Sequence, residues 1–228
     1  MKYLRYMSLI AGIATGAIAP QAGAQIPPLQ KGVSVQMAVT NNATPMPEAD
    51  SQGAWIVAVT TPGQIYFGTQ AVTAEQLSQE MKTHPRNRNA KLYIKADARA
   101  PYATVKKTLQ AAKELNLDNA VLLTKQPEAP ALGMMVPPKG FDVLLTPPSE
   151  AVVVQVSSSG QRAPELKVNN TAVSVANLQA ALNQALQNRS QRLVVVHADP
   201  QLPFAEVVQV IDAARSVGAT AVLPAAEM

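Results

Sequence analysis

Cysteine is absent from this chain of 228 residues, and histidine occurs only twice. Without cysteine there is no disulfide framework, no lipid attached at a cysteine and no thiolate nucleophile. Two isolated histidines offer too few ligands for a specific zinc site. No glycine-rich motif of the kind that cradles a phosphate occurs either. We therefore expect no catalytic residue, no cofactor-binding residue and no metal ligand.

Charged residues are also scarce, at 15% of the chain, and they nearly balance to a formal net charge of +4. Proteins that bind nucleic acid usually carry a pronounced basic patch or stripe, so this small excess gives little support for a nucleic-acid partner. Apolar residues make up 47% of the chain. That share is sufficient for packed cores and argues against a wholly disordered protein.

The first 24 residues have the features of a secretory signal peptide. Lys2 and Arg5 form a short positive region, residues 7–19 are mostly apolar, and Ala22–Ala24 supplies small residues for a signal peptidase. The apolar stretch is shorter than the roughly 20 residues that a membrane-spanning helix needs. We expect export with cleavage after Ala24, which would lower the net charge to +2; an uncleaved membrane anchor is the alternative.

One pattern of residues occurs twice, 102 positions apart. An apolar run at 91–97 and another at 192–199 both end in Ala-Asp, and each is followed by a proline and an aromatic residue, Pro101-Tyr102 and Pro203-Phe204. The identities continue into the next segment: Ala103, Val105, Ala111 and Ala112 recur as Ala205, Val207, Ala213 and Ala214. So many matches at one spacing indicate an internal duplication.

Further elements occupy matching places in the two copies. The expected strands are 33–39, 55–59, 65–67, 91–97 and 120–124 in the first copy, and 141–145, 152–156, 166–168, 192–199 and 220–223 in the second. A helix begins near Thr73 or Ser174, and another follows Pro101 or Pro203, since proline suits the first position of a helix. Thr73 with Gln76 also fits a capping box.

These elements predict an α/β (α+β) protein of two tandem repeats. Each repeat has the order β-β-β-α-β-α-β and forms a small mixed sheet with two helices on one face, because the closing β-α-β unit should cross over in the right-handed sense. The expected boundaries are a signal peptide at 1–24, domains at 32–126 and 140–226, and a proline-rich linker at 127–139.

Asp97 and Asp199 are the most suggestive polar residues, because each ends a strand just before a helix. Strand ends often carry binding groups in α/β proteins. An aspartate there can equally accept hydrogen bonds from the backbone of the turn, and its recurrence in both copies favours that structural role. We mark Asp97, Tyr102, Asp199 and Phe204 as positions for either partner binding or structure.

His197 lies two residues before Asp199, so both side chains should point to the same side of the strand. Such a pair could be a fragment of an acid–base site. The position that matches His197 in the first copy is Lys95, however, and no serine nucleophile is clearly placed beside the pair. A hydrolase that uses His197 and Asp199 is therefore only the alternative function.

Each copy resembles the periplasmic domain of the ExbD/TolR family of biopolymer-transport proteins. The resemblance rests on Ile56–Val59, Ile65–Thr73, Leu92–Asp97, Tyr102–Val105, Ala111–Leu115 and Ala120–Thr124, and in the second copy on Val168–Val173, Val194–Asp199 and Phe204. Members of this family carry an N-terminal transmembrane helix with an aspartate that takes part in proton-driven motor action. Here no Asp or Glu precedes Glu48, so no residue can take that role.

The resemblance implies a periplasmic, non-catalytic accessory of an ExbB/ExbD/TonB- or Tol-like energy-transduction system. Its implied partners are an ExbB/TolQ-like motor, a TonB/TolA-like protein or peptidoglycan, bound through sheet edges and loops around the repeat interface. Because the family's domains pair, the chain could form a homodimer or an intrachain pseudo-dimer. A structural envelope protein held by an uncleaved signal anchor is a further alternative.

Overall fold

The computed structural model of the chain describes residues 33–51, 53–84, 91–125, 127, 137–160 and 163–225. The expected signal peptide at 1–24 lies outside these residues, and so does most of the expected linker at 127–139. Among the helices of the described residues, none has the length and apolar character needed to cross a membrane.

Each half of the chain contains two α-helices and several short strands. The first half consists of β1 (Thr44–Pro45), the 3-10 helix η1 (Pro47–Asp50), β2 (Trp55–Val59), β3 (Ile65–Phe67), β4 (Gln70–Val72), α1 (Ala74–Thr83), β5 (Leu92–Ala96), α2 (Tyr102–Glu114) and β6 (Asn119–Thr124). The second consists of β7 (Lys139–Leu144), β8 (Val152–Ser157), β9 (Glu165–Val168), β10 (Thr171–Val173), the 3-10 helix η2 (Val175–Asn177), α3 (Leu178–Leu186), β11 (Leu193–Ala198), α4 (Phe204–Ser216) and β12 (Thr220–Val222).

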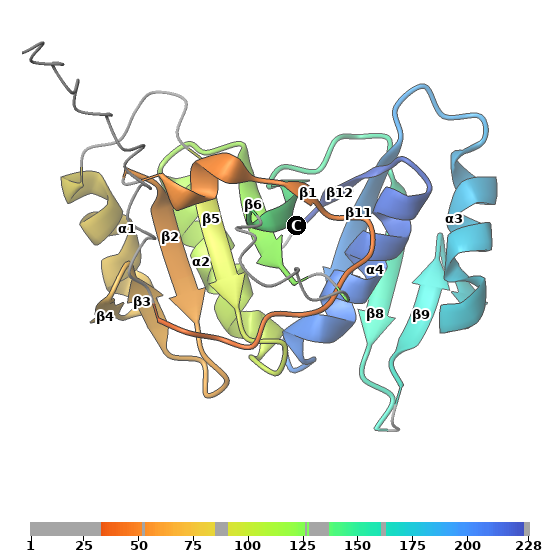
Figure 1. The fold of residues 1–228 in the computed structure, drawn as a ribbon. Coiled ribbons are helices and arrows are strands. Elements are labelled where there is room, and N and C mark those ends of the chain that lie inside the picture. The colour runs from red at the N-terminus through yellow and green to blue at the C-terminus, as the bar shows by residue number, and fades with distance from the viewer. Residues whose placement is uncertain are drawn as a thin grey trace, which may run out of the picture.

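The twelve strands belong to a single mixed sheet (Figure 1). Its order is β10-β9-β8-β11-β12-β7-β6-β5-β2-β3-β4, and β1 pairs with β7 beside this path. The predicted α/β class, with two helices in each half, is therefore confirmed. The expectation of a separate small sheet for each repeat is wrong, because β6 and β7 pair in antiparallel fashion along six residues and join the two halves.

The four α-helices bury their apolar faces in one core that both halves share. The helical residues of this core include Leu77 and Met81 of α1, Val105 and Leu109 of α2, Leu182 and Leu186 of α3, and Val207 and Ile211 of α4. Each fully buried aliphatic side chain of this kind contributes about 1.5–3 kcal/mol. The core thus crosses the boundary between the repeats, and the halves stabilise each other.

The structure adds a strand to each predicted repeat, so that the observed order is β-β-β-β-α-β-α-β in the second half. The additional strands, β4 and β10, have three residues each and form the two ends of the sheet. Three residues are too few to show the alternation that identifies a strand in a sequence. The capping box that follows β4 is confirmed, because the Thr73 hydroxyl accepts from the Gln76 backbone N–H at 3.2 Å and the Gln76 side chain accepts from Thr73 N–H at 3.0 Å.

The expected leading strand at 33–39 is wrong, since Met37 and Val39 form only isolated bridges, to Asp97 and Lys125. Its counterpart β7 does form, and it lies between β12 and β6, parallel to the first and antiparallel to the second. Through β12, β7 joins the strands of its own repeat as expected, and through β6 it also joins those of the first repeat. Because β7 occupies the edge of β6 that faces the other half, residues 33–39 have no continuous strand edge to pair with.

Residues 36–51 instead form a strap that links the two halves. The strap is the orange segment of Figure 1 that passes to β1 at the centre and returns through η1 to β2. On the way, the Asn42 backbone N–H donates to the Asp212 carboxylate of α4 at 2.8 Å, and β1 pairs with the first residues of β7. The strap is therefore held by elements of the second half as well as the first.

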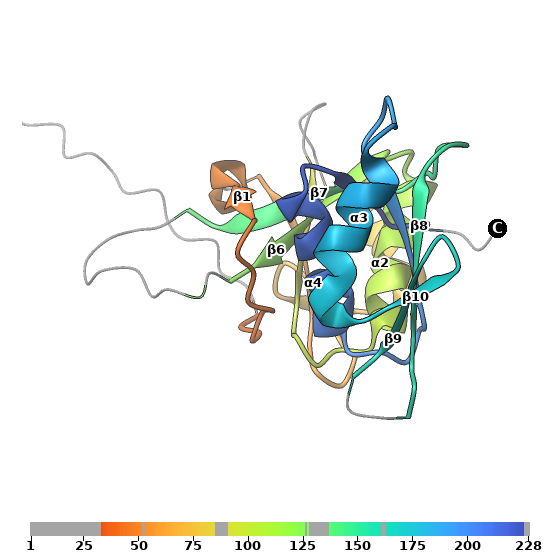
Figure 2. The same ribbon diagram turned by 90° about the vertical axis from the view of Figure 1, so that its right-hand side faces the viewer.

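The strap also covers part of the sheet face that the helices leave open. Met46 and Ala49 pack there on Tyr93, Val121 and Leu123, which point away from the main core. The turned view in Figure 2 places the strap and α2 at opposite sides of the molecule. This second, smaller core explains why β5 and β6 are apolar on both faces.

Candidate functional site

The two turns that follow β5 and β11 meet at a junction between the repeats. Pro101 and Pro203 form an antiparallel bridge there. The Tyr102 backbone N–H donates to the Leu202 carbonyl at 2.9 Å, and the Phe204 N–H donates to the Ala100 carbonyl at 2.8 Å. The two bonds are equivalent, because Tyr102 corresponds to Phe204 and Ala100 corresponds to Leu202 in the duplication. The junction is thus an approximate two-fold pair within one chain.

A second pair of hydrogen bonds repeats this relation. The Ala103 N–H donates to Pro200 O at 2.9 Å, and the Ala205 N–H donates to Ala98 O at 2.8 Å. The first N–H groups of a helix have no acceptor within that helix. At the junction, each helix of the pair α2 and α4 finds these acceptors in the turn of the other repeat. The start of each helix therefore depends on the presence of its partner repeat.

The predicted positions Tyr102 and Phe204 are the first residues of these two helices, and both are buried, with 2% and 0% of their surface exposed. Burial raises the pKa of the Tyr102 hydroxyl, since an ionised phenolate would lose its hydration. Both rings belong to the shared core. They hold the repeats together, and an external partner could contact them only if the junction opened.

Asp97 is buried at the end of β5, where it organises the first of the two turns. Its carboxylate accepts from the Arg99 backbone N–H at 3.0 Å, from Arg99 Nε at 3.0 Å and from Nη2 at 3.2 Å. The Gln36 backbone N–H adds a fourth bond at 3.1 Å. The Arg99 side chain is the main reason why the pKa of Asp97 lies well below its usual value, although burial opposes the shift. Asp97 thereby fixes both its own turn and the beginning of the strap.

Asp199, which matches Asp97, occupies a more open position. Within the described residues, its carboxylate accepts one hydrogen bond, from the Gln201 backbone N–H at 2.9 Å. The residue that matches Arg99 is Gln201, so the ion pair of the first turn has no counterpart in the second. The two aspartates share the turn geometry but differ in burial and in electrostatic environment.

His197 and Asp199 are not joined in the structure. His197 is exposed on β11, and within the described part of the chain its ring has no hydrogen bond. The Asp199 carboxylate is turned toward the backbone of Gln201 instead. Lys95, which matches His197, is half-buried on β5, and burial lowers the pKa of its ammonium group. The arrangement supplies no oriented acid–base pair for the alternative hydrolase.

Several contacts of this region have no signal in the sequence. Asp212 binds the backbone of Asn41 and Asn42 across 170 or more positions of chain. Lys91 forms an ion pair of 2.6 Å with Asp142 across β6. The bond from the Arg99 backbone N–H to Asp97 has a signal in the sequence, because an aspartate in a turn commonly accepts from the backbone two residues later. Among the described residues no group of three or more acidic or histidine side chains could hold a metal ion.

Fold and junction together define a duplicated α/β domain that is paired with itself within one chain. The family model for the biopolymer transport protein ExbD/TolR matches residues 20–127 and again residues 124–225. The chain therefore belongs to the ExbD/TolR family, and the resemblance seen in both copies is confirmed. No curated protein and no solved structure matches the chain.

Family membership makes the chain an accessory component of biopolymer transport. Members of the family are non-catalytic, and they generally work with ExbB or TolQ and with TonB or TolA proteins.

Proposed function

We propose that this protein is a periplasmic, non-catalytic binding component of an ExbB/ExbD/TonB- or Tol-like transport system, exported by a cleaved signal peptide. It presents the two domains of a pair in one chain and binds a motor subunit, a TonB- or TolA-like protein, or peptidoglycan. The observation that carries this proposal is the junction, where the Tyr102 N–H donates to Leu202 of the second repeat and the Phe204 N–H donates to Ala100 of the first.

The two ends of the sheet are the surfaces best suited to an extended partner segment. Among the strands of the described residues, β4 and β10 lie at the ends of the sheet and each has one edge without a neighbour. A peptide can add to such an edge through main-chain hydrogen bonds. At the β10 end, Val175 lies two residues beyond the strand and is 49% exposed, which makes it one of two large apolar residues exposed among the described residues. We therefore place the partner segment at β10.

Photo-crosslinking in intact cells tests this placement. A photoreactive residue at Ala172 of β10 should crosslink to an envelope protein. The same residue at Ala71 of β4 tests the opposite end of the sheet, and one at Lys82 on the outside of α1 serves as the control. Recovery of a motor subunit or a TonB- or TolA-like protein from Ala172 supports the proposal. Crosslinks from Lys82 alone would refute it. So would the absence of crosslinks from all three positions, if the purified protein also fails to bind peptidoglycan.

Mass spectrometry of the exported protein tests the export part separately. Cleavage after Ala24 gives a mature chain that begins at Gln25. A chain that retains Lys2 and Arg5 would instead identify the alternative, an envelope protein anchored by its signal segment.

A further inference from the structure

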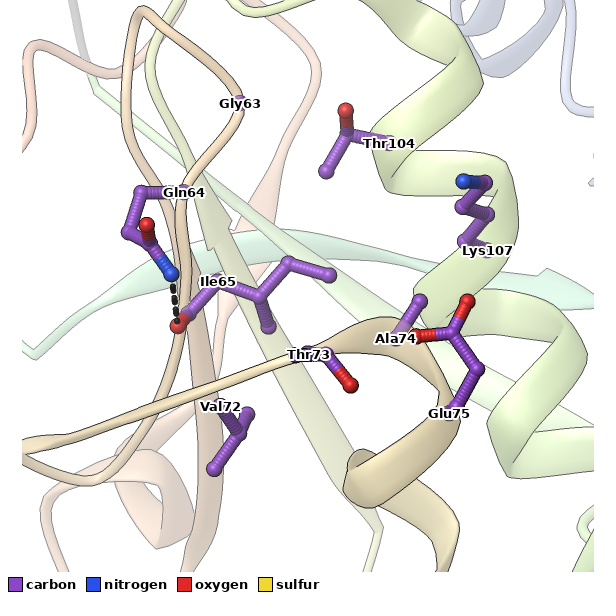
Figure 3. A pocket seen from close by; sticks show the side chains of 9 residues that line it. All are labelled: Gly63, Gln64, Ile65, Val72, Thr73, Ala74, Glu75, Thr104 and Lys107. Carbon is purple, nitrogen blue, oxygen red and sulfur yellow. Dashed lines mark hydrogen bonds between the residues drawn. The ribbon is translucent and has the colours of Figure 1, made fainter.

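A pocket of about 170 Å³ opens in the first half between the turn after β2, the beginning of α1 and the side of α2 (Figure 3). Its base is apolar, because Ile65 and Val72 line it and are both 4% exposed. Its rim is polar and carries Glu75 of α1 and Lys107 of α2. The volume is well below the roughly 300 Å³ at which sites for drug-sized ligands begin, so an occupant must be small.

Opposite charges face each other across this rim without forming an ion pair. Lys107 is exposed, and within the described part of the chain its ammonium group has no hydrogen bond or salt bridge. The pKa of Glu75 is lowered first by its own backbone N–H, then by the Thr73 hydroxyl, with further attraction from Lys107. One cation of α2 and one anion of α1 thus lie on the rim of the same pocket.

A hydroxyl group lies near Lys107, one turn earlier on the same helix (Figure 3). Thr104 of α2 is half-buried, and among the described residues its side chain has no hydrogen-bond partner. Gly63 brings the turn after β2 close to it: this glycine has a φ of +83°, and a Cβ atom there would lie 2.9 Å from Thr104 Oγ1. Because Gly63 has no side chain, the turn after β2 can lie close to the Thr104 hydroxyl, which can both donate and accept a hydrogen bond in the pocket.

The second repeat serves as an internal comparison. It retains the glycine of the turn, Gly160, but Glu75 is matched by Ala176 and Lys107 by Gln209. The second repeat has the same order of strands and α-helices without either charge. The charged rim is therefore a property of the first half that the fold itself does not require.

We propose that this pocket binds a small zwitterion, such as a free amino acid or a dipeptide, with its carboxylate at Lys107 and Thr104 and its ammonium group at Glu75. A plain anion would be repelled by Glu75, and a plain cation by Lys107, whereas a zwitterion satisfies both charges at once. The inference is independent of the partner proposed above, since it concerns a surface away from β10.

Titration of the ¹⁵N-labelled protein with alanine and with alanyl-alanine tests the inference. Both probes should shift the amide signals of Gly63, Gln64 and Glu75 in a saturable manner. Lys107→Gln and Glu75→Ala, which introduce the residues of the second repeat, should each weaken binding about tenfold, the value of one charge-assisted hydrogen bond. Lys82→Gln removes the same charge from the exposed surface of α1 and should leave the affinity unchanged.

The simpler ligands acetate and methylammonium decide between the possible binding chemistries. Each should bind at least about tenfold more weakly than alanine, because each lacks one of the two charges. If acetate binds as tightly as alanine and Glu75→Ala has no effect, the site recognises anions and the inference is wrong. The inference would also be overturned if neither alanine nor alanyl-alanine produced saturable shifts in the native protein while its spectrum showed intact folding.

Discussion

Replacement of Asp97 by asparagine keeps the size of a buried side chain while it removes the charge and one of the two acceptor atoms. In the native protein Oδ1 accepts two N–H groups of Arg99, and Oδ2 accepts Gln36 N–H and a third N–H of Arg99. Whichever way the new amide is turned, its NH₂ group faces two donors. The Arg99 side chain is 64% exposed, so solvent weakens the contribution of its ion pair to stability. For Asp97→Asn we therefore expect a loss of about 2 kcal/mol of unfolding free energy.

Asp199→Asn is the matched control for this change. Among the described residues, Asp199 accepts a single backbone N–H at one oxygen, and an asparagine can keep its oxygen there. The expected cost lies within about 0.5 kcal/mol, as for most surface substitutions. Urea unfolding followed by circular dichroism measures both values. Equal losses for the two variants would show that the Arg99 and Gln36 contacts do not distinguish the turns, and the reasoning would be refuted.

The pH dependence provides a second readout of the same contact. The pKa of Asp97 is lower in the folded protein than in the unfolded chain. Its stabilising contribution is therefore complete above the unfolded pKa of about 3.9 and is lost as the pH falls toward the folded value. Between about pH 5 and pH 2 the native protein should lose more stability than Asp97→Asn. Parallel curves over this range would contradict the assignment.

Three further predictions concern the junction, the strap and the central strands. Phe204→Ala empties a fully buried site in the shared core and should cost about 3–5 kcal/mol in urea unfolding; a cost below about 1 kcal/mol would show that the junction repacks freely. Asp212→Ala removes the acceptor of the Asn42 N–H, so hydrogen exchange of that amide should accelerate, while exchange in the core of α4 stays unchanged. In Gly140→Ala the new Cβ would lie 2.6 Å from the Leu122 carbonyl oxygen, which should separate β6 from β7 and cost at least about 1–3 kcal/mol; a variant as stable as the native protein would exclude this close approach.

The internal duplication made much of the fold predictable from the sequence. Local signals, such as the capping box at Thr73 and the prolines before α2 and α4, gave the positions of helices correctly because they depend on neighbouring residues only. The duplication supplied each of these signals twice. The strand β7 and the aspartate turns were likewise predicted from short, local patterns.

Long-range pairing was not predictable in the same way. The central place of β7 depends on a competition between β7 and residues 33–39 for the edge of β6, and no local pattern reports its outcome. The contact between Asn42 and Asp212 joins residues 170 positions apart. At the candidate site, the sequence shows the aspartates at the ends of strands, but the reciprocal bonds of Tyr102 and Phe204 use backbone groups that every sequence has.

Covalent linkage of the two paired domains has a consequence for symmetry. In a homodimer both protomers have the same sequence, so a charged pocket or an Arg99-type ion pair must occur twice or not at all. A tandem chain keeps its two domains together at any protein concentration, because their association is intramolecular. It can also change one domain without the other, as Lys107 and Gln209 illustrate. A pair of this kind can distinguish its two ends, and so can give a partner a single orientation where a symmetric dimer would offer two.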